Sequence, residues 1–235
     1  MSLIDTASFY LPDFLIGVFG AVFVALILGF FLPYFAKSKS NPPFKPLGFG
    51  AVVIGALSAA GVFAALYFIN NSTALMVFVW SIIAGIGGVL SMTDFAFHRA
   101  PNIYNLNQFV LVAGALVINT VIEQNWMDLV WALVALVGSA VILFPLLYVV
   151  KLGAGDIKYI PTVAMALGYL NIYLAVGYLI VAYLLNFVFS IGVLIVEKSR
   201  GVPAKDIKGP MIPPYYYGLA VLPLFVSSGM IGVLG

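Results

Sequence analysis

Residues 129–150 read LVWALVALVGSAVILFPLLYVV, an apolar run without a charged side chain. A helix needs about 20 apolar residues to cross the hydrocarbon layer of a membrane, so this run predicts a transmembrane helix. The segment that follows, KLGAGDIK at 151–158, places a glycine-rich turn and an aspartate before another apolar run. The fold therefore depends on how many such runs exist, and the function on why the chain keeps Asp156.

The composition is that of an integral membrane protein. Of 235 residues, 64% are hydrophobic and 8% are charged, whereas soluble domains carry about 25% charged residues. The absence of cysteine excludes disulfides, thiolate metal sites and a cysteine nucleophile, and the single histidine, His98, excludes a histidine metal cluster. The first eleven residues contain no Lys or Arg, so they lack the basic region of a cleavable signal peptide. We expect an all-α polytopic helix bundle that keeps its first apolar run.

Eight apolar runs are candidate spans, which predicts about eight transmembrane helices. They are 12–36, 49–69, 74–93, 103–122, 129–150, 157–170, 172–196 and 213–234. All ten Lys and Arg residues follow the first, third, fifth or seventh run. Because basic loops stay in the cytoplasm, this pattern predicts a multi-pass protein of the cell membrane with both termini outside.

Three local features refine this topology. The sixth run is short and contains Pro161, so we expect it to be tilted or to join the seventh run as a re-entrant unit. The stretch AGIGGV at 84–89 is expected to permit close helix packing. Trp126, Trp131 and the three tyrosines at 215–217 lie near predicted helix ends, where aromatic rings anchor at the lipid headgroups.

Two aspartates lie at predicted helix ends on the cytoplasmic side. Asp94 ends the third span and Asp156 opens the sixth. For either aspartate alone, a structural explanation is as good as a functional one: the carboxylate is solvated or, for Asp156, caps the next helix. Two carboxylates that approach closely in a low dielectric would share one proton, which supplies the acid and the base of aspartic-protease chemistry without a cofactor. Gly153 and Gly155 would then allow a tight turn and the approach of a substrate backbone.

These motifs resemble a known family. GAGDIK at 153–158 resembles the GxGDxK motif of the type IV prepilin peptidases, and DFAFHRAPN at 94–102 resembles the stretch around their first catalytic aspartate. The tail GPMIPPYYYGLAVLP near the last span also matches. The resemblance covers the chain from about 74 to the end. It implies that Asp94 and Asp156 are the catalytic pair, that 74–235 is a six-helix membrane aspartic peptidase core, and that 1–73 is a two-helix extension.

The resemblance also implies an activity and its partners. The protein would be an aspartic endopeptidase that needs no cofactor and cuts the short basic leader from type IV pilin-like or archaellin precursors at the cytoplasmic membrane face. Expected partners are those precursor segments and membrane lipid, and not nucleic acid. The cysteine-rich segment linked to N-methylation in bacterial members is missing, so the chain is more similar to the archaeal members.

Three further residues are assigned supporting roles. Lys158 would orient or tune Asp156, although a lysine that extends to the membrane interface explains its position equally well. Pro101 and Asn102 would shape the turn into the fourth span.

Two other functions compete with this interpretation. A presenilin-like or signal-peptide-peptidase-like protease shares the GxGD motif, but it usually has Tyr before its first aspartate, where this chain has Thr93, and Pro-Ala-Leu near its last span. A transporter could use the two carboxylates as a proton or cation site. It would be expected to show a second Gly/Pro-interrupted partner for the sixth run, and the sequence shows none.

Overall fold

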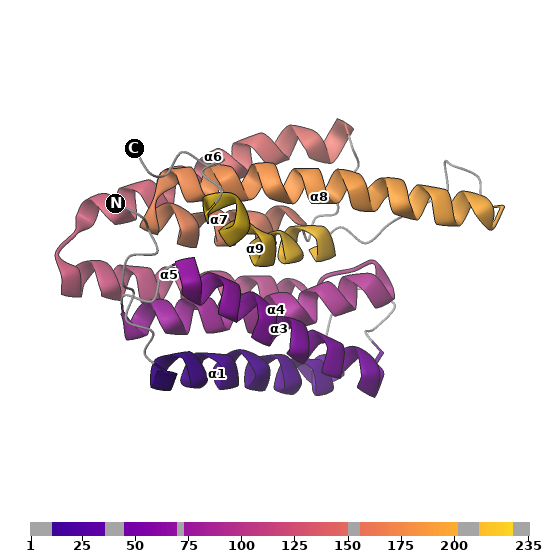
Figure 1. The fold of residues 1–235 in the computed structure, drawn as a ribbon, viewed down its shortest axis with the longest axis horizontal. Coiled ribbons are helices and arrows are strands. Elements are labelled where there is room, and N and C mark those ends of the chain that lie inside the picture. Colours follow the sequence, from indigo (N-terminus) through magenta and orange to yellow (C-terminus); the bar gives the residue numbers. More distant parts are fainter. Residues whose placement is uncertain (1–10, 36–44, 70–72, 150–155, 202–211, 228–235) are drawn as a thin grey trace.

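The computed structural model describes residues 11–35, 45–69, 73–149, 156–201 and 212–227, and the regular structure in these ranges is all helical (Figure 1). The described ranges contain eight longer helices and one helix of four residues. In chain order they are α1 (Leu11–Phe30), α2 (Leu32–Phe35), α3 (Phe49–Ile69), α4 (Ala74–Phe97), α5 (Asn102–Glu123), α6 (Trp126–Val149), α7 (Asp156–Leu170), α8 (Ile172–Ser199) and α9 (Ile212–Ser227).

Six of these helices, α1, α3, α4, α5, α6 and α8, are long and apolar enough to cross a membrane, which indicates a multi-pass membrane protein. The remaining two longer helices, α7 and α9, have 15 and 16 residues. At about 1.5 Å per residue, the described parts of these two helices are shorter than the ~30 Å hydrocarbon layer. Within the residues that the structure describes, the eight expected runs therefore each contain a helix, and six of those helices have the length of a span.

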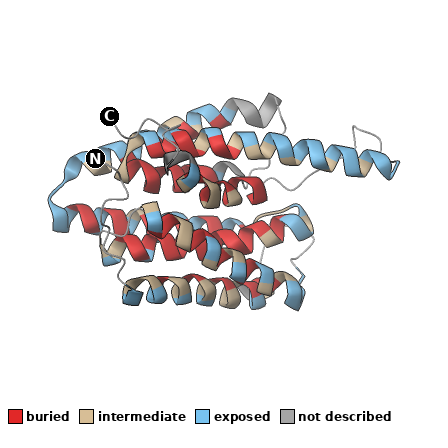
Figure 2. Ribbon diagram, in the orientation of Figure 1, coloured by how far each residue is buried: buried red, intermediate tan, exposed pale blue. Residues whose placement is uncertain are grey.

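The short helix α7 is surrounded by protein instead of lipid. Its residues 159–169 are buried without interruption, and it contacts α4, α5, α6, α8 and α9. The other central helix is α4, which contacts α1, α3, α5, α7 and α9 and is buried throughout 79–91 (Figure 2). The two helices at the centre of the bundle are thus the two that carry the aspartate motifs.

The sixth and seventh runs form two helices that are divided at Asn171. The side chain of Asn171 accepts a hydrogen bond from the backbone N–H of Tyr173 at 2.9 Å and so caps α8. Because α7 and α8 also pack against each other, they form a tight helical hairpin.

The glycines of α4 allow its neighbours to approach its backbone, as the sequence predicts. A Cβ atom added at Gly85 would lie 2.8 Å from the carbonyl oxygen of Ala21 in α1. A Cβ atom added at Gly88 would lie 2.6 Å from the carbonyl oxygen of Gly55 in α3. Only glycine fits at such contacts, because any side chain would overlap the backbone of the next helix.

The first helices of the chain belong to the same core as α4. Buried residues of α1 and α3 form one continuous apolar cluster with those of α4, α7 and α9. Hydrogen bonds reinforce this packing: the Ser81 hydroxyl donates to the carbonyl of Gly17 at 3.1 Å, and the Tyr104 hydroxyl donates to that of Leu28 at 2.8 Å. The division of the chain at residue 73 stays a prediction, but α1 and α3 support α4 directly.

Candidate active site

Asp94 lies in the last turn of α4, and its side chain contacts the start of α9. The residue is only 7% exposed, and its carboxylate Oδ2 accepts a hydrogen bond from the backbone N–H of Ile212 at 2.9 Å. Ile212 is the first residue of α9, where N–H groups have no partner within the helix. A carboxylate at this position is also favoured by the helix dipole. Asp94 therefore joins the end of α4 to the beginning of α9.

The segment after Asp94 leads directly into α5. His98 ends α4 in the left-handed conformation (φ 51°, ψ 37°), and its N–H donates to the carbonyl of Asp94 at 2.8 Å. Pro101 is buried immediately before α5, and its carbonyl accepts the N–H of Tyr104 at 3.1 Å. This short connection places Asn102, the first residue of α5, at the same end of the bundle as Asp94.

The second motif begins α7. Asp156 is the first residue of that helix, as expected from the sequence. Gly153, Gly155 and the side chain of Asp156 lie outside the part of the chain that the structure describes. The pairing of the Asp94 and Asp156 carboxylates stays a prediction.

Lys158 connects the two motifs. Its Nζ donates a hydrogen bond to Oδ1 of Asn102 at 2.7 Å, between side chains that are exposed. This contact brings the first turn of α7 against the first turn of α5. Two residues that the sequence predicts to support the site, one from each motif, are therefore in direct contact.

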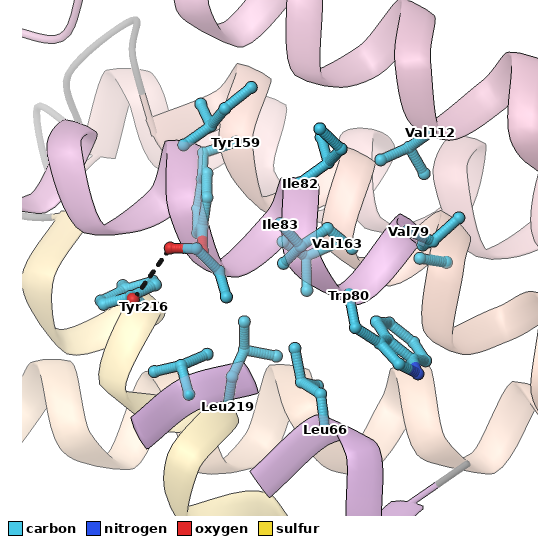
Figure 3. Close-up of a cluster of buried hydrophobic side chains, with 14 of the residues drawn as sticks. Leu66, Val79, Trp80, Ile82, Ile83, Val112, Tyr159, Val163, Tyr216 and Leu219 are labelled. Atoms are coloured by element: carbon cyan, nitrogen blue, oxygen red, sulfur yellow. Dashed lines mark hydrogen bonds between the residues drawn. The ribbon is translucent and has the colours of Figure 1, made fainter. Parts of the chain in front are cut away.

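Tyrosines from α7 and α9 converge on α4 next to this end of the bundle (Figure 3). The Tyr216 hydroxyl donates to the carbonyl of Ala84 at 3.0 Å. A Cβ atom added at Gly87 would lie 2.6 Å from the ring of Tyr216 and 2.7 Å from the hydroxyl of Tyr159. Gly87 therefore provides the space into which both rings fit.

The expectation that the tyrosines at 215–217 anchor at the lipid headgroups is wrong for two of the three. Tyr215 and Tyr216 are fully buried, and the Tyr178 hydroxyl donates to the carbonyl of Tyr215 at 3.3 Å. These rings fill the interior between α4, α8 and α9. In contrast, Trp126 and Trp131 are 57% and 41% exposed, and their anchoring at the headgroups stays a prediction.

Two residues that the sequence reasoning missed lie on α5. Asn105 and Gln108 are buried, and their side-chain amides make no hydrogen bond within the described ranges. The available signal was the polar spacing in NIYNLNQF at 102–109, since amides three residues apart interrupt an apolar span. The bond between Asp94 and Ile212, in contrast, joins distant segments and has no local signal.

Comparisons with known proteins found no relative of this chain. No protein-family model, curated protein or solved structure matches the chain. The resemblance to the prepilin peptidases therefore stays a prediction that rests on the motifs at 94–102 and 153–158.

Proposed function

We propose that this protein is a membrane aspartic endopeptidase that removes the short basic leader from type IV pilin-like or archaellin precursors at the cytoplasmic face of the membrane. Asp94 and Asp156 are its catalytic pair. The observation that carries this proposal is the 2.7 Å hydrogen bond from Lys158 to Asn102, because it joins the two segments that contain these aspartates.

The contact supports the pair in two steps. Asp94 and Asn102 flank the short connection between α4 and α5, so both belong to one end of the bundle. Asp156 and Lys158 both belong to the first turn of α7. The contact between α4 and α7 supports a close approach of the helix ends that carry the aspartates. An aspartic peptidase requires this arrangement.

The chemistry follows from one proton shared by two carboxyl groups. The ionised carboxylate takes a proton from water while the water oxygen bonds to the carbonyl carbon of the peptide, and the protonated carboxyl donates its proton to the carbonyl oxygen. When this intermediate collapses, the carboxyl that took the proton from water gives it to the nitrogen and the C–N bond breaks. The other carboxylate takes a proton from a hydroxyl of the intermediate as the new C=O forms, which restores the pair with its one shared proton. The burial of Asp94 favours this state, because two adjacent carboxylates in a low dielectric do not both ionise.

The substrate class fits the predicted topology. All Lys and Arg residues fall in alternate connections or in the helix turns next to them, which favours a cytoplasmic location for the end of the bundle that carries Asp94 and Lys158. A precursor whose apolar helix lies in the membrane and whose basic leader stays in the cytoplasm has its cleavage point at that depth. Recognition of the apolar helix and cleavage beside it then need no soluble domain.

The test is an incubation of the purified protein with a panel of pilin-like and archaellin precursors, read by the masses of the products. Wild-type protein should release the leader, and Asp94→Asn and Asp156→Asn should each abolish cleavage without lowering the yield of folded protein. Asp128→Asn is a matched control, because Asp128 lies in the first turn of α6 at the opposite end of α5; it should cleave at the wild-type rate. Wild-type cleavage by either variant of the pair contradicts the assignment, and no cleavage of any precursor by wild-type protein contradicts the function.

A further inference from the structure

One face of α5 packs between α4 and α7. Its buried residues Asn105, Gln108, Val112, Ala115 and Asn119 recur every three or four positions, a spacing that places side chains on one side of a helix. Val112, in the middle of this face, belongs to the buried cluster that α4 and α7 form (Figure 3). Asn105, Gln108 and Asn119 therefore lie on one buried face of α5.

The end of this face away from Asp94 is closed by hydrogen bonds. Asn119 Oδ1 accepts from the hydroxyl of Thr73 at 3.1 Å, and Asn119 Nδ2 donates to the hydroxyl of Tyr169 at 3.0 Å. Thr73 caps the start of α4 and Tyr169 lies in α7. Asn119 thus joins three helices, and both of its side-chain polar atoms have partners.

At the end of this face near Asp94, the buried polar side chains are not paired in this way. Asn105 is 2% exposed and Gln108 is fully buried, yet none of their amide atoms has a hydrogen-bond partner within the described residues. The buried hydroxyls of Ser91, one turn before Asp94, and of Tyr159, in the first turns of α7, also have no partner in that part of the chain. Unpartnered polar groups from three helices are therefore gathered within about two turns of the proposed catalytic end.

Such groups are costly unless something binds them. A buried amide without a hydrogen bond loses its interaction with water and gains nothing in return, and the membrane interior supplies no bulk water. A carboxamide both donates and accepts, which matches the alternating N–H and C=O groups of a peptide main chain. Charged ligands would instead be expected to require a buried charge, and neither α5 residue has one.

We propose that Asn105 and Gln108 bind the main chain of the precursor segment that unwinds beside the scissile bond; this inference rests on the proposed peptidase function. A peptide bond must leave the helical conformation before a catalytic pair can reach it. Its N–H and C=O groups then lose their helical partners, and they need new hydrogen-bond partners in the buried surroundings of Asn105 and Gln108. Amides that bind the main chain recognise precursors with different side chains, which suits an enzyme with several substrates.

The experiment replaces both amides with an apolar side chain of similar size, Asn105→Leu with Gln108→Leu, in the full-length protein. Two quantities are measured in detergent: the midpoint of thermal unfolding, and kcat and KM for a precursor that the wild type cleaves. The unfolding midpoint should be equal to or above that of the wild type, because replacing an unpaired buried amide removes an unmet polar group. KM should rise by about tenfold or more, because the hydrogen bonds to the substrate main chain are lost. The value of kcat should change little, because these hydrogen bonds stabilise the bound substrate and the transition state equally.

Asn119→Leu is the matched control on the same face. It removes an amide whose atoms are paired, so it should lower the unfolding midpoint and leave KM unchanged. If the leucine variants do not fold, Asn105→Ala with Gln108→Ala, which adds no bulk, takes their place in the same assays. An unchanged KM in the double variant overturns the inference and leaves the peptidase function standing, as does a loss of stability without a change in KM. Failure of wild-type protein to cleave any precursor overturns both.

Discussion

Gly87→Ala tests whether α4 is packed as tightly as the structure indicates. The new Cβ would lie 2.6 Å from the ring of Tyr216 and 2.7 Å from the hydroxyl of Tyr159, about 1 Å closer than the ~3.5–4.0 Å of a favourable carbon–carbon contact. Neither ring can easily move, because both are fully buried and Tyr216 is bonded to the carbonyl of Ala84. Overpacking of this kind costs about 1–3 kcal/mol.

Gly114→Ala is the control, since Gly114 lies in α5 with nothing within 4 Å of its added Cβ. There, alanine should stabilise the helix by roughly 0.5–1 kcal/mol, because glycine loses more backbone freedom on folding. The two variants should therefore shift the free energy of unfolding in opposite directions when purified protein is unfolded reversibly in mixed micelles.

A second substitution isolates the cause. Tyr159→Phe removes the hydroxyl that meets the new Cβ, so it should recover part of the stability lost in Gly87→Ala and show a coupling energy in a double-mutant cycle. If Gly87→Ala is as stable as Gly114→Ala, the close approach of α7 and α9 to α4 is refuted. If Tyr159→Phe recovers nothing, the ring of Tyr216 alone sets the cost.

Two further predictions concern the contacts at the proposed catalytic end. Asp94→Asn keeps an oxygen that can accept the N–H of Ile212, so this variant should unfold near the wild-type midpoint while losing cleavage. Asp94→Leu leaves that buried N–H unpaired, so its free energy of unfolding should fall by about 1–3 kcal/mol. Equal stability of the two variants would show that the bond does not hold α9. Lys158→Met removes an exposed hydrogen bond to Asn102. It should change the free energy of unfolding by less than about 1 kcal/mol and still reduce cleavage. Cleavage at the wild-type rate would show that the contact does not organise the site.

The positions of the helices follow from hydrophobicity alone, because lipid imposes a simple requirement on the chain. The run at 49–69 coincides with α3, and 157–170 differs from α7 by a single residue. Hydrophobicity does not distinguish a helix that faces lipid from one that is buried, since both are apolar. The central position of α7 is therefore visible only in three dimensions.

The tyrosines at 215–217 illustrate the same limit. At a helix start next to prolines, their rings suit a headgroup region or a protein interior equally well, because a tyrosine has an apolar body and a polar tip. Burial of Tyr216 depends on the space at Gly87, in a distant helix. The partner of Asp94, the N–H of Ile212, is equally remote in sequence. Local patterns identify which residues are unusual, whereas the partners of those residues depend on how α4 and α9 pack.

Buried polar groups at the two ends of α5 differ in whether they have hydrogen-bond partners. At one end, Asn119 ties α4, α5 and α7 together through two hydrogen bonds; in the middle, glycine contacts hold α4 against α1 and α3. These contacts fix the helices without help from Asn105 or Gln108, whose amides have no partner in the described chain. Residues that lower stability are retained where they serve activity. A stabilising effect of apolar substitution at Asn105 and Gln108, combined with weaker substrate binding, is therefore the result that would most directly link the interior of this protein to its proposed reaction.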